Sequence, residues 1–400
     1  QPMYSPINLD PSSDEKDNTF LMVNNVYLYG SYDPENGKVA DTEVNVKNTP
    51  SILSGKETNY HVLLGAGDRN QSNLNVYSKV DGFVIEKGKA QGSGDITVNN
   101  SGINKGYGAG AYFDNSRVKI NNSIFRNNDG KVRAGGLYAE RDSDVMLSNT
   151  LMYDNKVNEE GSAIYATNGN TKVTIVNSTI ADNQSLAGGD AGAVHLSSNA
   201  DYYIYNSIVW NNKNKNGLAN LTGGDSEDNG WNVYNSLINR KSNLKNNSDG
   251  HNDGENGGKI NFRSYDPKFV NAAARDYSLQ PTSPAIDKGN INHYIGESLN
   301  GSIDAYGNGR NYFDGIDIGA IEATKVVAKN ISELYVNSSV SGGDKTGSTW
   351  ANAMPNLADA LQWVLRMNNN YTAANPLKIY VAKGIQNPMY SSDARIHRNS

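Results

Sequence analysis

The sequence predicts an all-β fold, a right-handed parallel β-helix, from three observations. First, an Asn-Ser or Asn-Thr phrase recurs with gaps of 27, 28, 29 and 29 residues, beginning at Asn122, Asn149, Asn177, Asn206 and Asn235. Second, each of the first four phrases continues with a mostly apolar pair of residues and ends at another Asn. Third, a segment of small residues precedes each of these phrases by about a dozen positions. A period this steady indicates stacked copies of one structural unit.

Each copy has room for three short strands and no helix. In the second copy a small-residue segment leads into residues 137–138, an alternating run follows at 145–147, and the phrase supplies the third strand. Strands in so short a repeat pair with their equivalents in the next copy, so that like side chains stack above one another. A β-propeller is the rival architecture, but its blades need about 40 residues and four strands.

The recurrent Asn residues suit an internal ladder between coils. An Asn amide both donates and accepts hydrogen bonds, so it can satisfy the turn backbone and the Asn of the next coil together. The residues that end the first four phrases recur in the same way, at Asn128, Asn155, Asn183 and Asn212. We therefore interpret the recurrent Asn residues as structural and not as the lining of an active cleft.

The composition of the chain disfavours several classes of function and of binding site. The 400-residue chain carries a formal net charge of −6 and shows no basic stripe, which disfavours nucleic-acid binding. It has no Cys, which removes disulfides, thiolate chemistry and Cys-based zinc sites and fits an exported protein. No apolar run is long enough to span a bilayer, and Gln1 is not followed by a signal segment, so we expect an excised or processed piece.

Before the repeats, residues 1–18 are polar and are predicted to form an irregular loop. Short strands are then expected at 20–23, 26–30, 51–53, 61–64 and 80–85, bounded by Asn, Gly and Pro. After the fourth repeat, residues 214–260 are rich in Gly and Asn. We expect this insertion to form loops that project from one edge of the solenoid.

Two sets of motifs resemble known secreted proteins. Tyr-Gly at 29–30, Ile-Leu-Ser-Gly at 52–55, Tyr-His-Val at 60–62 and Asp-Gly-Phe-Val-Ile at 81–85 resemble β-helix proteins of Bacteroidota-type bacteria. Asp-Pro-Lys-Phe-Val at 266–270, Ser-Pro-Ala-Ile-Asp-Lys-Gly at 283–289 and Asp-Ile-Gly-Ala-Ile-Glu at 317–322 resemble the C-terminal signature of the "choice-of-anchor Q" domain family. The resemblance implies an extracellular, cell-surface location and export by the type IX system.

The chain is divided into a β-helix body with its closing motif at 1–323, a linker at 324–332, and the N-terminal cap and first strands of a following unit at 333–400. The cap is predicted from strands at 334–336 and 379–381 and from an amphipathic helix at 350–367, whose apolar positions are Leu357, Ala360, Leu361, Val364 and Leu365. Pro-Met-Tyr-Ser at 388–391 repeats residues 2–5 at an offset of 386. We infer a tandem array of units, with about 11 or 12 coils and roughly 55 Å of length in each.

The closing motif gathers five acids and one base within 36 residues: Asp287, Asp304, Arg310, Asp314, Asp317 and Glu322. In one interpretation, Asp304, Asp314 or Asp317 binds calcium together with backbone carbonyls. In the other, which we favour, Arg310 pairs with Asp317 or Glu322 and seals the last coil. No other cofactor is expected.

We expect a non-enzymatic tandem repeat unit of a large secreted adhesin or filament stalk, in which the rod is a stiff spacer. Adjacent repeats of the same chain are its first expected partners. Surface glycans or proteins are expected at the 214–260 loops and at Tyr202, Tyr203 and Tyr205, because aromatic faces bind sugars and partners well.

The alternative is a carbohydrate-active β-helix, either a polysaccharide lyase or a glycoside hydrolase. Such a site needs several acids, often with a base, on one face of neighbouring coils. The candidates are Arg126, Asp154 and Asp182, but Asn211 takes the acidic position in the next repeat. We interpret them as a solvated ladder of turn residues. The five His residues show no metal-binding spacing and are interpreted as structural.

Overall fold

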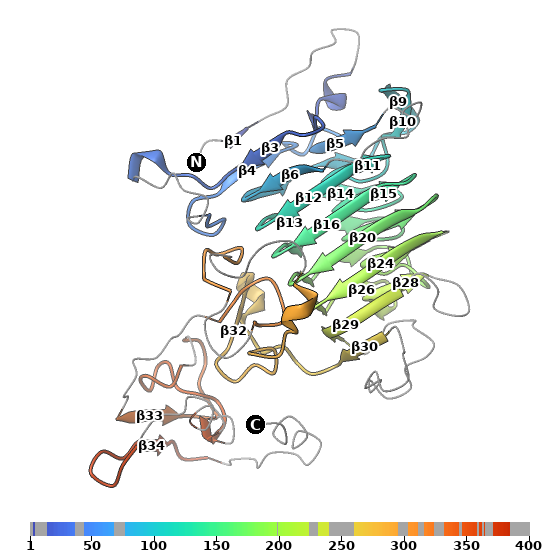
Figure 1. Cartoon of the computed structure of the whole chain (residues 1–400). Helices are drawn as coiled ribbons and strands as arrows, with labels where there is room; N and C mark the ends of the chain where they lie inside the picture. The colour runs from blue at the N-terminus through green and yellow to red at the C-terminus, as the bar shows by residue number, and fades with distance from the viewer. Residues whose placement is uncertain are drawn as a thin grey trace.

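A computed structural model describes residues 3–4, 14–36, 44–67, 77–197, 199–223, 231–239, 260–294, 303–310, 316–323, 332–343, 346–357, 360–361, 364 and 371–384. These residues form a right-handed parallel β-helix of about six turns, which confirms the predicted fold class. The coils stack from β1 and β3 at one end to β29 and β30 at the other (Figure 1). About six coils give a stack of roughly 30 Å, so the expectation of 11 or 12 coils was wrong.

One coil shows how the repeat folds. It consists of β11 (Ala111–Asp114), β12 (Arg117–Asn121), β13 (Ile124–Arg126) and β14 (Asp129–Gly130). Each strand pairs in parallel with its equivalent in the next coil, which is β15 (Leu137–Glu140), β16 (Asp144–Ser148), β17 (Leu151–Tyr153) and β18 (Lys156–Val157). The three strands expected in each repeat are present, and a fourth strand of two residues joins them.

The equivalent strands line up into three sheets. The seven-stranded sheet follows the order β2 (Phe20–Leu21), β5 (Leu63–Ala66), β11, β15, β19 (Ile164–Thr167), β23 (Val194–Leu196) and β28 (Leu221–Gly223). The six-stranded sheet contains β27 (Gly217–Leu218), β26 (Lys213–Asn214), β22 (Gln184–Ser185), β18, β14 and β8 (Lys89–Ala90). The 15-stranded sheet contains β1 (Met3–Tyr4), β4 (Ser51–Ser54), β7 (Phe83–Glu86), β13, β17, β21 (Thr179–Ala181), β25 (Ile208–Trp210), β29 (Trp231–Ile238), β24 (Ala200–Tyr205), β20 (Thr171–Val176), β16, β12, β6 (Ser78–Asp81), β3 (Tyr27–Tyr29) and β30 (Ile260–Arg263).

The main core lies inside the coils because strand residues alternate between the two faces of each sheet. In β11, Ala111 and Phe113 belong to the central apolar cluster, whereas Tyr112 packs in a separate cluster on the outer face. That outer cluster is covered by a hairpin of β9 (Asp95–Val98) and β10 (Ser101–Asn104). The solenoid is therefore packed on both faces of this sheet in its first half.

Two segments that were expected to be loops contain strands. Within residues 1–18, β1 pairs with β4, and a 3-10 helix spans Glu15–Asp17. Within 214–260, β28 and β29 continue two of the sheets, because Leu221 follows Val194 in register and Trp231 follows Tyr202. The remaining parts of this insertion, 224–230 and 240–259, lie outside the described residues.

The closing segment, described at residues 265–294, 303–310 and 316–323, runs along the outside of the solenoid beside several coils (Figure 1). It contains a small hairpin of β31 (Phe269–Asn271) and β32 (Asp276–Leu279) and 3-10 turns at Ala272–Ala274 and Ile291–His293. Its backbone reaches an early part of the chain, where the Val46 amide donates to the Ala305 carbonyl at 3.1 Å. The expectation that it seals the last coil was therefore wrong.

The C-terminal module, residues 332–384 as far as they are described, has its own small core. β33 (Glu333–Val336) and β34 (Lys378–Val381) pair in parallel, and Leu334, Val336 and Met354 pack with Ala360. Residues 357, 360, 361 and 364 are helical, whereas 350–356 form turns and bends, so the helix begins later than predicted. The described residues include no helix that is long and apolar enough to cross a membrane.

Candidate functional site

The Asn residues that end each phrase form a ladder inside the solenoid. Asn128 Nδ2 donates to Asn155 Oδ1 at 2.9 Å, and the bonds from Asn155 to Asn183, Asn183 to Asn212 and Asn212 to Asn220 have the same length. Asn155 also accepts from the Asn128 backbone amide at 3.3 Å and donates to the Phe125 carbonyl at 2.9 Å. This ladder is fully buried and uses both donors and both acceptors of the amide, as the sequence predicted.

The Asn residues that open each phrase have a different role. All five adopt left-handed backbone angles, with φ from 43° at Asn177 to 50° at Asn149, which Asn tolerates better than most residues. The side chains of the last four bind the closing segment, whereas Asn122 Nδ2 donates to Asp81 Oδ1. Nδ2 of Asn149 donates to the Ile303 carbonyl at 2.9 Å, and Nδ2 of Asn177 donates to the Asp317 carbonyl at 2.7 Å. These Asn residues therefore form the attachment line for the closing segment.

The fourth opening residue, Asn206, makes the most complete contact. Its Nδ2 donates to the Asn290 carbonyl at 3.0 Å, its Oδ1 accepts from the Asn290 amide at 2.8 Å, and its carbonyl accepts from the Gly319 amide at 2.8 Å. Gly319 has a φ of 109°, and an added Cβ would lie 2.8 Å from Ile208 Cδ1. The Gly of the 317–322 motif is thus favoured by its positive φ, and a side chain there would also crowd Ile208 of the solenoid.

Arg310 lies between the attachment line and the acids of the closing motif. It is fully buried, and its Nη1 lies 3.2 Å from Glu322 Oε2, one of the two partners that the sequence suggested. Its Nε donates to Asn149 Oδ1 at 2.9 Å and its Nη2 donates to the Asn177 carbonyl at 3.2 Å. One guanidinium therefore joins two successive coils to the closing segment.

The proposed calcium ligands already accept hydrogen bonds from the chain. Asp304 Oδ1 accepts from the amides of Tyr306 and Asn308, and its Oδ2 accepts from the Glu322 amide at 2.6 Å. Asp317 accepts from the amides of Asp287 and Ala323. Asp314 lies outside the described residues. In the part of the chain that the structure covers, no three His, Asp or Glu side chains form a metal-binding group.

Burial dominates the electrostatics of this cluster. It raises the pKa of Asp304, raises that of Asp317 to about 7 and raises that of Glu322 to about 8. The negative charge of Asp317 raises the pKa of Glu322 further, whereas the nearby Arg310 lowers the pKa of all three carboxyls. Burial therefore shifts all three carboxyls toward their protonated forms.

The turn acids considered for catalysis also bind the closing segment. Asp154 and Asp182 adopt left-handed φ values of 53° and 55° on successive coils. Arg275 Nη2 lies 2.6 Å from Asp154 Oδ1, its Nη1 lies 3.5 Å from Asp182 Oδ2, and the Tyr277 hydroxyl donates to that same oxygen at 2.8 Å. Their interpretation as solvated residues was wrong. Arg126 lies apart from this pair of acids and contacts Glu86 at 2.7 Å.

The three tyrosines proposed as contact residues do not share one surface. Tyr202 is fully buried, stacks on Trp231 with ring centroids 4.9 Å apart and donates to the His195 carbonyl. Tyr203 and Tyr205 are partly exposed on the outer face, where Tyr205 stacks on His293 of the closing segment at 4.8 Å. Only these two tyrosines remain accessible for a partner.

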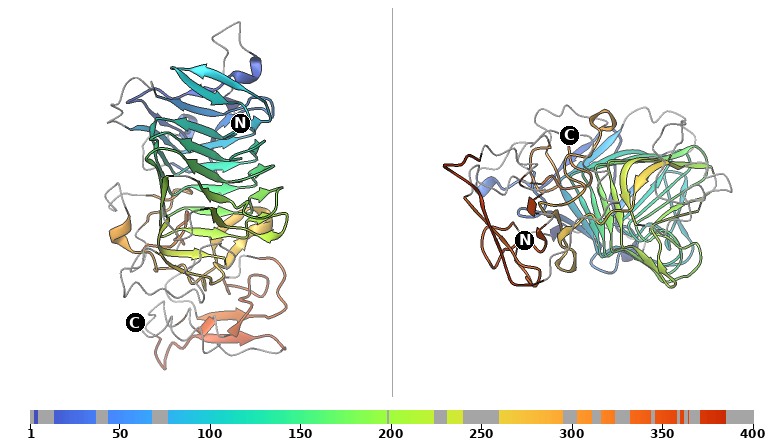
Figure 2. Two further views of the ribbon diagram at one scale, coloured as in Figure 1. Left: turned by 90° about the vertical axis from the view of Figure 1, so that its right-hand side faces the viewer. Right: turned by 90° about the horizontal axis from the view of Figure 1, so that it is seen from below.

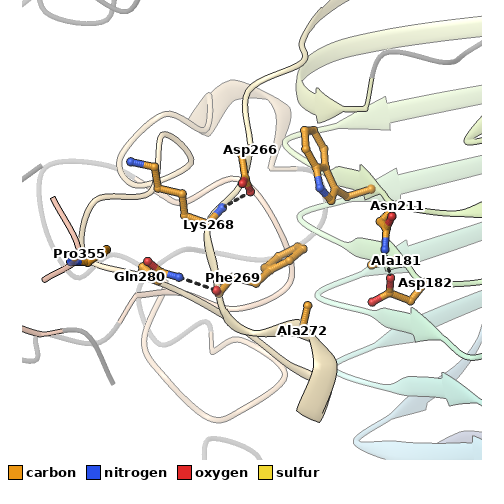
Figure 3. A pocket seen from close by; sticks show the side chains of 10 residues that line it. Ala181, Asp182, Asn211, Asp266, Lys268, Phe269, Ala272, Gln280 and Pro355 are labelled. Carbon is orange, nitrogen blue, oxygen red and sulfur yellow. Dashed lines mark hydrogen bonds between the residues drawn. The ribbon is translucent and has the colours of Figure 1, made fainter. Parts of the chain in front are cut away.

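A cavity of about 400 Å³ lies between the solenoid and the closing segment (Figure 3). Its walls combine aromatic rings, carboxylates, amides and one cation: Ala181, Asp182, Trp210, Asn211, Asp266, Lys268, Phe269, Ala272, Gln280 and Pro355. An aromatic face beside several polar groups suits a polar ligand with apolar patches, such as a sugar. Sequence reasoning missed this site, because Trp210 and Phe269 meet only when the closing segment is docked.

A second cluster missed by the sequence joins Asp114 and Glu140, which are register neighbours on β11 and β15. The Arg141 guanidinium donates to both oxygens of Asp114 at 2.8 Å and also contacts Glu140. Glu140 accepts from the Tyr112 hydroxyl at 2.6 Å, and burial raises its pKa. Both acids are buried on the outer face of the sheet. The arrangement is an acid pair on adjacent coils, clamped by one arginine.

The comparisons with known proteins agree with this architecture. Residues 62–238 match the family model described as "Right handed beta helix region", and the match extends from β5 to β29. Neither the comparison with curated proteins nor the comparison with solved structures yields a match. The family description gives a fold and no activity.

Proposed function

We propose that this chain is a non-enzymatic tandem unit of a large secreted cell-surface adhesin or filament stalk, in which the solenoid is a stiff spacer. The observation that carries the proposal is the attachment of the closing segment to Asn149, Asn177 and Asn206 on three successive coils. In a solenoid each coil otherwise contacts only its neighbours. Because the closing segment bonds to several coils at once, it limits bending of the solenoid. This property suits a load-bearing spacer.

The extracellular, cell-surface location is part of the same proposal. The motif resemblance to the "choice-of-anchor Q" family supports it. Its first proposed partners are the neighbouring repeat units, which belong to the same polypeptide chain. Export by the type IX system, and use of the array in attachment or gliding, follow from the resemblance.

We assign the adhesive contact to the cavity between the solenoid and the closing segment. Trp210 offers a half-buried aromatic face, and Asn211 and Gln280 offer amide groups at the same opening. Sugars bind to such combinations because their C–H faces pack on aromatic rings while their hydroxyls bond to amides and carboxylates. The proposed ligand class is therefore a surface glycan.

A glycan array tests this assignment with two variants of the full chain. Trp210→Ala should reduce binding at least tenfold, because it removes the aromatic wall of the cavity. Tyr203→Ala, a partly exposed tyrosine outside that cavity, should leave binding unchanged. Equal binding by wild type and Trp210→Ala would remove the cavity from the proposal, and loss of binding only in Tyr203→Ala would move the contact to the tyrosine surface.

A carbohydrate-active enzyme is the second candidate, and one observation favours it. Asp114 and Glu140 are register neighbours on adjacent coils, which is the placement that an acid and base pair needs. Incubation with a panel of acidic polysaccharides tests this function. Release of reducing ends or unsaturated products by the wild type, and their loss in Glu140→Gln, would support the enzyme. A panel without products would favour the spacer.

A further inference from the structure

Exposed large apolar side chains gather at the two ends of the molecule. Of the eleven found among the described residues, five lie between residues 21 and 29 and four between 350 and 381. The first group, which we call the N-terminal face, consists of Leu21, Val23, Val26, Tyr27 and Tyr29. The second group lies on the C-terminal module and consists of Trp350, Leu361, Tyr380 and Val381. The N-terminal coils and β33–β34 stand at opposite ends of the molecule (Figures 1 and 2).

The N-terminal face is also an open sheet edge within the described part of the chain. β3 is the last strand on its side of the 15-stranded sheet, and β2 is the last strand of the seven-stranded sheet. In β3, Leu28 packs against the main core, whereas Tyr27 is 54% exposed. An edge with such apolar side chains is a template for one more strand.

The C-terminal module presents strands of the matching kind. β33 and β34 pair in parallel, as stacked coils do, and Tyr335 stacks on its register partner Tyr380 with centroids 5.3 Å apart. Within the described residues, β34 has no strand on its other edge. Its outward Tyr380 and the terminal Val381 are 38% and 41% exposed. The module therefore ends in a parallel edge with a tyrosine on its surface.

Strand order in the solenoid identifies the position that β34 fits. In each coil the strand before a β13-type strand is a β12-type strand, as in β6 before β7 and β3 before β4. β1 is a β13-type strand because it pairs with β4. The strand that precedes β1 should therefore pair with β3.

The repeated sequence connects this position to β34. Met3–Tyr4 of β1 recurs as Met-Tyr at 389–390, and β34 ends eight residues before that recurrence. In a tandem array, β34 of one unit is thus the last described strand before β1 of the next. Its register partner is β3 of that following unit.

Charge favours the same pairing. Residues 14–36, which carry the N-terminal face, contain five acids and one Lys. Residues 371–384, which carry β34, contain Lys378 and Lys383 and no acid. Opposite net charges of this kind attract the two ends toward each other and disfavour pairing of two like ends.

We propose that β34 of one copy of this chain adds in parallel to β3 of a second copy, so that the Tyr335–Tyr380 stack continues onto Tyr27 or Tyr29. The inference rests on the proposed function as a tandem unit and gives that unit a specific docking surface. The contact is head-to-tail and repeats without closing, so it builds an extended, continuous solenoid. The neighbouring units share one sheet and are not beads on a flexible linker.

The absence of Cys makes cross-linking a direct test. A two-unit chain is built by joining residues 1–386 to a complete second copy, which preserves the 386-residue offset. The first copy carries Tyr380→Cys, and the second carries either Tyr27→Cys or Tyr29→Cys. Adjacent strands place Cα atoms about 4.8 Å apart, within the range that a disulfide requires. We expect mild oxidation to form the disulfide in at least one of these two pairs.

The matched control carries Leu186→Cys in the second copy, an exposed apolar residue on the side of the solenoid. Peptide mapping of the cross-linked chain identifies the joined residues. If neither tyrosine pair forms a disulfide faster than the Leu186→Cys control, the docking surface is refuted. Glycan binding by the Trp210 variants is measured separately, so loss of the docking surface and loss of the proposed adhesive function give different results.

Discussion

The interior Asn ladder gives the sharpest prediction about stability, and Asn155→Leu tests it. Leucine has nearly the same size, so the change removes the amide without opening a large cavity. Four hydrogen bonds disappear: those from the Asn128 amide and Asn128 Nδ2, and those to the Phe125 carbonyl and Asn183 Oδ1. At about 1 kcal/mol for each buried bond, the free energy of unfolding should fall by about 4 kcal/mol.

The cost can exceed that sum because partners stay behind. The ladder is fully buried, so water cannot replace the missing amide, and a stranded buried donor or acceptor costs about 1–3 kcal/mol by itself. The apolar gain of the leucine side chain works in the opposite direction and offsets about 1–2 kcal/mol. Destabilisation by several kcal/mol remains the expected result.

Urea denaturation followed by circular dichroism measures the effect. The matched control is Asn158→Leu, an exposed Asn in the same coil, which should change stability by less than about 0.5 kcal/mol. We expect the urea concentration at the unfolding midpoint to fall strongly in the Asn155 variant and to stay close to the wild-type value in the control. Equal midpoints for the two variants would refute the predicted stabilisation, because the ladder would then satisfy polar groups without stabilising the stack of coils.

Three further predictions concern the closing segment. Burial raises the pKa of Glu322 to about 8, and its Oε1 has no hydrogen-bond partner among the described residues. The folded state therefore keeps a proton on Glu322 that the unfolded chain releases above about pH 4. Stability should therefore fall as pH rises from 5 to 8, by about 1.4 kcal/mol per pH unit for each proton, and urea titrations should show a flatter profile for Glu322→Gln. Arg310→Met should release the closing segment from two coils and accelerate limited proteolysis within 265–323, whereas Arg133→Met, whose guanidinium packs on the Tyr165 ring, should not. Calcium and a chelator should both leave the thermal midpoint unchanged, since Asp304 and Asp317 accept amide hydrogen bonds; a midpoint raised by calcium would restore the metal site.

The fold could be predicted from the sequence because its determinants are local and periodic. The phrase that includes Asn149 and Asn155 repeats every 27 to 29 residues, and each Asn bonds to the equivalent residue one period away. A single repeat therefore contains the information for its own contacts. His195 follows the same rule, because it is the register partner of Tyr165 one coil away and stacks on that ring at 4.8 Å.

The candidate site could not be predicted in the same way. Arg275 and Asp154 are 121 residues apart, and Arg310 and Asn149 are 161 residues apart, with no repeat connecting them. The acids of the closing motif were recognised as a group, but nothing in their spacing shows which side of the solenoid they meet. One signal was present: Asp154 and Asp182 occupy the same turn on successive coils, and such a pair offers a site for one bridging cation.

The Asn residues that open and close a phrase have different structural roles, although both recur with the same period. The closing residue, such as Asn155, points into the coil and joins neighbouring coils. The opening residue, such as Asn149, holds a left-handed turn and binds the closing segment. A stack that is joined only between neighbours can fray from its ends, because each coil is stabilised by local terms. A closing segment that is distant in sequence and bonds to several successive coils makes their unfolding interdependent. In the rod that we propose, each closing segment would add resistance to fraying, so we expect the load-bearing repeat to be the whole unit with its closing segment and not the single coil.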